Sequence, residues 1–246
     1  MNRERVNRFF RKFGFELHGT GYMQSLKKGS FKDNAFNVQR EILRQGVKVI
    51  FDIGANRGDT VMAYEQLFPG KRIFAFEPFP ESFDQLYNRT KGNENITCFQ
   101  KAISDSLGAK TLYVNNNVDT NSLLQSIRSG LSSDKQVITR GEIKVTTVTI
   151  DSFCKEEHII EIDILKMDIQ GGELAALMGA KELLTSKKIK LIYTESFFKE
   201  QYRDQPLFYD IANYLRSFDY YLLDIYEPHY GNGAIAWCDA IFLPRQ

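Results

Sequence analysis

The sequence predicts an α/β fold built on an open, mostly parallel sheet. The first observation is a strand–turn–helix unit at 49–60, where an apolar run ends in an acid and a glycine-bearing turn follows. The second is that apolar strands ending in acids alternate with helical segments on both sides of the middle of the chain. The third is the short connection between 220–225 and 234–243, which forces an antiparallel hairpin at the end.

Length and composition fit one large domain with an extension. At 246 residues we expect a helical extension over 1–45 and a main domain over 46–246, with an insertion at about 108–150. The formal net charge of +1 gives no basic footprint for a nucleic acid. Three distant cysteines are typical of reduced thiols. Without a membrane-length apolar run or a signal peptide, we expect a cytoplasmic protein.

Residues 2–13 carry an amphipathic helical pattern. Val6, Phe9, Phe10 and Phe13 share one face, and the remainder is mostly basic. Two interpretations stand: a helix that packs on the main domain, or one that binds a membrane surface or a glycan-assembly partner and makes the protein membrane-peripheral. A second helix is expected from Asp33 or Asn34 to Arg44, with Gly46 as its stop.

The first half of the main domain reads as a strand–helix alternation that is then interrupted. We expect strands at 47–53, 72–76 and 96–103, and helices at 60–67 and 80–89. Segments 109–114 and 143–150 then have the period of two that is typical of strands. They flank a polar loop, so we interpret this region as an insertion over the sheet edge that could act as a lid.

The alternation resumes in the second half. Strands are expected at 164–169 and 189–194, with helices at 173–186 and 206–218. The closing strands at 220–225 and 234–243 are joined by the loop 227–233.

The turn after the first strand indicates a cationic ligand. It reads Gly54-x-Asn56-x-Gly58, so a dinucleotide fingerprint is broken at its second glycine. No Gly-Lys-Ser/Thr follows, which excludes a phosphate loop. Asp52 and Asp59 flank the turn, and these acids disfavour a pyrophosphate but suit a sulfonium that carries an α-amino group. The alternative is a tight turn with capping acids and no ligand.

Acids recur where the expected parallel strands end. Asp52, Glu77, Asp168 and Glu195 end four strands, and Asp105 follows a fifth. In an open α/β sheet these ends meet at the ligand crevice. Glu77 follows Gly54 by 23 residues, near the ~20 expected for the acid that accepts the ribose hydroxyls.

The order and spacing of several motifs resemble the FkbM family of S-adenosylmethionine-dependent methyltransferases. The resemblance covers about 47–198 and more loosely the last strand. It is carried by Val49 to Thr60, Ala75 to Pro78, Lys101 to Asp105, Val148 to Asp151, Leu165 to Leu174, Leu177 to Ala180, Ile192 to Glu195 and Trp237 to Phe242.

This resemblance implies a class I methyltransferase (Rossmann-like) fold, with a seven-stranded sheet, an antiparallel last strand and helices on both faces. It also implies methyl transfer from S-adenosylmethionine to a hydroxyl oxygen, often on a sugar or a polyketide. The expected cofactor-binding residues are Asp52, Gly54, Asn56, Gly58, Thr60, Glu77, Pro78, Ala102, Ser104, Asp105 and Asp168. Gln170 departs from the family, because many relatives carry Glu there.

A hydroxyl acceptor needs a base within reach. Asp168 and Glu195 are the first candidates, and His229 is a third if the hairpin loop overhangs the crevice. No ligand spacing predicts a metal site, although Asp168 and Glu195 could together hold a divalent cation.

Three other functions compete with this interpretation. A nicotinamide-dependent oxidoreductase, NAD- or NADP-linked, shares the ribose acid, but the broken glycine pattern and Asp52 argue against it. A nucleic-acid base methyltransferase acting on an exocyclic amine would carry an Asn/Asp-Pro-Pro-aromatic turn where this chain has Asp168 to Gly171. The set of strand-end acids disfavours a non-catalytic binding module.

Overall fold

The computed structural model describes residues 34–44, 46–127, 136–231 and 233–245. The expected helix over 2–13 lies outside these residues. The helices are α3 (Ala35–Leu43), α4 (Asp59–Leu67), α5 (Pro80–Thr90), η2 (Val118–Thr120), α6 (Ile150–Glu156), α7 (Glu173–Met178), α8 (Lys181–Thr185) and α9 (Phe208–Arg216). The strands are β1 (Val49–Ile53), β2 (Arg72–Phe76), β3 (Ile96–Phe99), β4 (Ala102–Ile103), β5 (Gly108–Asn115), β6 (Thr139–Val148), β7 (Ile164–Met167), β8 (Ile192–Phe197), β9 (Tyr220–Gly231) and β10 (Ala234–Pro244).

A seven-stranded sheet forms the centre of the molecule, in the order β3-β2-β1-β7-β8-β10-β9. The pairs from β3 to β8 are parallel, and β10 runs antiparallel to both of its neighbours. This confirms the predicted mostly parallel sheet with an antiparallel last strand. Strand order reverses between β1 and β7, and this switch point is where open α/β sheets bind their ligands.

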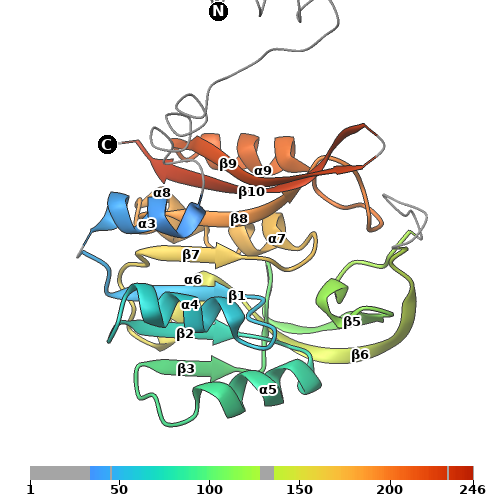
Figure 1. The fold of residues 1–246 in the computed structure, drawn as a ribbon, viewed down its shortest axis with the longest axis horizontal. Coiled ribbons are helices and arrows are strands. Elements are labelled where there is room, and N and C mark those ends of the chain that lie inside the picture. The colour runs from blue at the N-terminus through green and yellow to red at the C-terminus, as the bar shows by residue number, and fades with distance from the viewer. Residues whose placement is uncertain (1–33, 45, 128–135, 232, 246) are drawn as a thin grey trace, which may run out of the picture.

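Helices cover both faces of this sheet and divide the core in two. One cluster packs α3, α4 and α5 through side chains such as Val38, Tyr64 and Leu86. The other packs α6, α7, α8 and α9, with Phe153 and Leu215 among its members. β1 is buried at every position, because apolar layers lie on both of its sides. Figure 1 shows the carboxyl ends of β1, β2 and β7 pointing toward the side where β5 and β6 lie.

The region 96–103 corrects the prediction of a single strand. β3 ends at Phe99, where its pairing with β2 also ends. Ala102 and Ile103 then pair with Thr147 and Val148 of β6. β5 and β6 pair antiparallel, which completes a separate three-stranded sheet, β4-β6-β5. The chain therefore leaves the seven-stranded sheet after β3 and enters the three-stranded sheet at β4.

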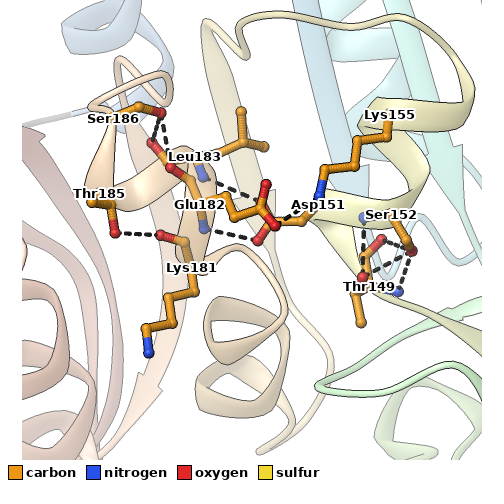
Figure 2. A network of polar contacts seen from close by, with 9 residues as sticks. All are labelled: Thr149, Asp151, Ser152, Lys155, Lys181, Glu182, Leu183, Thr185 and Ser186. Atoms are coloured by element: carbon orange, nitrogen blue, oxygen red, sulfur yellow. Dashed lines mark hydrogen bonds and ion pairs between the residues drawn. The ribbon is translucent and has the colours of Figure 1, made fainter.

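The helix expected over 173–186 is broken in two at Gly179. A Cβ at this position would lie 2.3 Å from the carbonyl oxygen of Ser104, so the backbone approach requires glycine. The N-cap residue of α8, Ala180, makes no side-chain cap. Asp151 of α6 supplies the missing acceptors, because its carboxylate accepts hydrogen bonds from the Glu182 nitrogen at 2.8 Å and the Leu183 nitrogen at 3.2 Å (Figure 2).

The first described helix matches the prediction from sequence, whereas the closing hairpin differs from it in the length of β9. Asn34 caps α3 by accepting from the backbone nitrogens of Phe36 and Asn37, as predicted. The closing hairpin is present, but β9 continues to Gly231. His229 therefore lies in a strand opposite Trp237 and not in a loop. None of the helices within the described ranges is long and apolar enough to cross a membrane.

Candidate active site

The turn after β1 depends on its two glycines. Gly54 has φ +79°, and a Cβ there would lie 1.9 Å from the carbonyl oxygen of Asp168. Gly58 has φ +87°, and a Cβ there would lie 2.9 Å from the Leu86 side chain. Glycine removes both clashes, so the turn can press against the end of β7 and begin α4 at Asp59.

Glu77 holds this turn and the start of the next segment together. Its Oε2 accepts a hydrogen bond from the Asn56 nitrogen at 2.9 Å, and its Oε1 accepts one from the Phe79 nitrogen at 2.8 Å. Burial raises the pKa of Glu77 to about 7 against the opposing effect of these two backbone bonds. The Asn56 Oδ1 is buried and has no hydrogen-bond partner among the described residues, so it is available to a ligand.

A pocket opens beside Glu77 at the switch point. Its cavity volume is about 120 Å³, and it is partly open to solvent. Its walls come from the ends of β1, β2 and β7, from the segment around β4, and from the insertion. The lining residues include Gly54, Asn56, Glu77, Pro78, Lys101, Ala102, Ile103, Leu112, Asp119, Ser122, Leu123, Asp168, Ile169 and Gln170.

The insertion is attached to the glycine turn through Asp119 of η2. Its Oδ1 accepts from the Asn56 amide at 2.9 Å and pairs with the Arg57 guanidinium at 3.1 Å. Both charged side chains are about half exposed. An exposed pair of this kind contributes only about 0–1 kcal/mol. The contact therefore joins the insertion to the turn but adds little to the stability of that arrangement.

Two acids meet beside the glycine turn and are bridged by one amide: Asp168 follows β7, whereas Glu195 lies within β8, which continues to Phe197 and does not end at Glu195 as predicted. The Gln170 Nε2 donates to the Asp168 Oδ1 at 3.1 Å and to the Glu195 Oε2 at 2.8 Å. Burial raises the pKa of Glu195 well above its usual range, and the charges of Asp168, Glu173 and Asp239 add to that rise. Asp168 is exposed and lines the pocket. The pair therefore combines a solvent-facing carboxylate with one that holds a proton strongly.

Asp52 occupies a different position from the pocket-lining acids. It is fully buried and forms an ion pair with Lys166 at 2.9 Å, and the Lys166 Nζ also donates to the Gly54 carbonyl at 3.2 Å. Burial opposes the charge of Lys166, but Asp52 and Asp168 outweigh it and hold the pKa of this lysine above its ordinary value. Asp52 therefore supports the glycine turn indirectly, because it holds the Lys166 ammonium beside the Gly54 carbonyl.

The remaining predicted residues lie around the pocket. Gly58 and Thr60 begin α4, and neither they nor Ser104, Asp105 and His229 are among the pocket-lining residues. Asp105 is paired with Lys110 at 2.5 Å. His229 is exposed and stacks on Trp237, with ring centroids 4.6 Å apart and an interplanar angle of 12°. In the described part of the chain no group of three or more His, Cys, Asp or Glu residues is arranged to hold a metal ion.

Sequence reasoning missed several residues of this site. Gln170 was noted only as a departure from the family pattern, and Lys166, Asp119 and Tyr202 were assigned no role in the turn or the acid pair. The contacts Tyr202–Gln170, Asp119–Arg57 and Lys166–Gly54 join residues that are 32, 62 and 112 positions apart. The one local signal was the Gln170 departure itself, since a polar side chain beside two acids is suited to bridging them.

Comparison with known proteins identifies the same part of the chain. The sequence model of a family described as "Methyltransferase FkbM domain" matches residues 52–222. A 2-O-methyltransferase, NoeI, from Sinorhizobium fredii is 31% identical over 195 residues, which cover 76% of this chain and 79% of that protein. The 31-O-demethyl-FK506 methyltransferase FkbM from Streptomyces tacrolimicus is 27% identical, covering 66% and 70%. A hexuronic acid methyltransferase, AglP, from Haloferax volcanii is 22% identical, covering 58% and 54%.

Proposed function

Since this chain belongs to the FkbM methyltransferase family and is an S-adenosylmethionine-dependent methyltransferase, we propose that its acceptor is a hydroxyl group of a sugar or glycan. Two of its relatives have names that specify an oxygen position, and a third is named for a hexuronic acid. These names describe the relatives, and they support an oxygen acceptor on a carbohydrate for this chain.

The residues of the pocket fit the methyl donor. Glu77 offers a carboxylate to a vicinal diol, and the unpaired Asn56 Oδ1 offers a further acceptor beside it. Ala102, Ile103 and Leu112 provide apolar lining suited to an adenine ring. Asp168 also lines the pocket, where its carboxylate would stabilise a cationic sulfonium. Pro78 and Ala102 also line the pocket.

The acid pair is the observation that carries the proposal. The bound donor supplies an already activated methyl group, so the protein mainly has to position the acceptor and manage one proton. A sugar hydroxyl must lose its proton as it attacks, and Asp168 is a carboxylate at the pocket wall with Glu195 beside it. We assign Asp168 as the base or orienting group and Glu195 as its proton-holding neighbour. His229 stacks on Trp237 outside the lining and is the alternate base.

The direct test is product analysis. The full chain would be incubated with methyl-labelled S-adenosylmethionine and a panel of oligosaccharides, uronic acids, non-sugar alcohols and amines. We expect a single added methyl group on a sugar oxygen, located by mass spectrometry of fragments. Methylation of amines, or of non-sugar alcohols in preference to every carbohydrate, would contradict the proposed acceptor.

A further inference from the structure

Gln170 adopts a conformation that an ordinary side chain rarely takes. Its φ is +55°, and Gly171 follows at φ +95°. Such a backbone persists only where the surroundings hold it, and it is common at functional sites. Here the insertion holds it, because the Ser122 hydroxyl donates to the Gln170 carbonyl at 2.7 Å. The strained residue is therefore fixed by a segment that lies 48 positions earlier in the chain.

The side chain of Gln170 is fixed from a second direction. Tyr202 is fully buried, and its hydroxyl lies 2.9 Å from both the Gln170 Oε1 and the Thr120 carbonyl. The single phenolic proton is shared between these two oxygens. The backbone nitrogens of Gln201 and Tyr202 donate to the buried side chain of Gln205, which fixes the loop that carries the phenol. A continuous set of contacts thus runs from the insertion through Tyr202 to the Gln170 amide.

The far end of that amide serves the two acids. Both hydrogens of Nε2 are used on carboxylates, one on Asp168 and one on Glu195. Other groups facing Glu195 are Glu173 from α7, Asp239 from β10 and Tyr202. Lys166 forms its ion pair with Asp52 and also interacts electrostatically with Asp168. Gln170 is thus a neutral donor inside a predominantly acidic group, and its hydrogen bonds stabilise negative charge on the pair.

We propose that Gln170 and Tyr202 are positioning residues that couple the insertion to the acid pair: the relay Thr120–Tyr202–Gln170 holds Asp168 and Glu195 side by side and places one amide donor against both, which stabilises the negative charge on the pair. The inference rests on the proposed function for its catalytic meaning. The effect of the relay on the negative charge of the acid pair can be measured without an acceptor.

The test uses the charge difference between two cofactor forms. S-adenosylmethionine carries a sulfonium and S-adenosylhomocysteine does not, so the ratio of their dissociation constants reports the negative charge at the end of the pocket. Calorimetric titration of the full chain with each ligand across a pH series gives the midpoint at which this preference is lost on acidification. We expect Gln170→Leu to raise this midpoint by about one pH unit, because the ionised carboxylates lose their donors. Tyr202→Phe should raise it less, since the amide stays but loses its anchor.

Tyr220→Phe is the matched control. It removes a hydroxyl that donates to the Ile189 carbonyl at 2.7 Å, just before β8, from another buried tyrosine ring. We expect it to lower stability without moving the midpoint. Hydrogen exchange of 118–124 should rise in Tyr202→Phe and stay unchanged in Tyr220→Phe. An unchanged midpoint in folded Gln170→Leu, or a ratio that is independent of pH in the unmodified chain, would overturn the proposal. Failure to methylate a sugar would instead overturn only the acceptor assignment.

Discussion

At the scale of single residues, Glu77 links the fold to cofactor binding through its protonation. Burial raises the pKa of Glu77 to about 7, so a large fraction of this carboxyl is protonated at neutral pH. Ribose hydroxyls donate to the ionised form, which means that a bound nucleoside favours proton release. Affinity for S-adenosylhomocysteine should therefore increase as the pH rises through about 7. Calorimetry in buffers of different ionisation enthalpy would detect the released proton. Glu77→Gln should bind more weakly and lose this release, whereas the same release in Glu77→Gln would assign it to another group.

Asp168 is the second residue whose substitution should change catalysis in a defined way. Asp168→Asn keeps the shape of the side chain and removes its charge. General-base assistance is worth about 10²–10⁴-fold, so turnover should fall by about that factor. Affinity for S-adenosylhomocysteine should stay within a few-fold, because this ligand lacks the sulfonium. The measurement is steady-state kinetics with the acceptor found by product analysis. His229→Ala should retain turnover, and a loss confined to His229→Ala would move the base to β9.

At the scale of elements, Asp151 joins α6 to the start of α8. It caps α8 from α6, where Ala180 cannot (Figure 2). Asp151→Ala should lower the free energy of unfolding by about 0.5–2 kcal/mol, the range for lost helix caps. Thermal unfolding monitored by circular dichroism would measure this, with cofactor affinity unchanged. Glu182→Ala is the control, since it removes only the exposed ion pair with Lys155 and should have almost no effect. Equal destabilisation by both variants would refute the capping role.

The elements also show where prediction from sequence succeeded. Mostly apolar segments such as 49–53 and 164–167 fold as expected, because a strand buried on both faces leaves a nearly continuous apolar run, interrupted here by the paired Asp52 and Lys166. The split of 96–103 and the break at Gly179 depend on pairing with β6 and on contact with Ser104, which no local pattern reveals. In the site, the glycine turn and Glu77 were predictable from spacing. The bridge made by Gln170 was not predictable, because it depends on three partners that are distant in the sequence, Ser122, Glu195 and Tyr202.

At the scale of the whole molecule, the expected helix over 2–13 raises the question of location. Its basic and aromatic pattern supports the proposal that it brings the enzyme to a membrane surface that carries a lipid-linked glycan. Flotation with vesicles containing anionic lipid should carry the full chain and leave a variant lacking residues 2–13 behind. High salt should reverse the association, because part of it is electrostatic. Equal partitioning of both proteins would refute this role and favour packing on the main domain.

The placement of the methyl donor at the switch point of the sheet, with Glu77 on its ribose, is the claim on which the other assignments depend. Titration calorimetry of S-adenosylhomocysteine against the full chain, Glu77→Ala and Asp105→Ala tests it most directly. Glu77→Ala loses two charge-assisted hydrogen bonds of roughly 1.5–3 kcal/mol each before compensation. We therefore predict one site in the unmodified chain, a loss of affinity of at least about tenfold in Glu77→Ala, and unchanged affinity in Asp105→Ala, whose carboxylate pairs with Lys110 outside the pocket. No binding by the unmodified chain, or equal binding by a folded Glu77→Ala, would contradict the account.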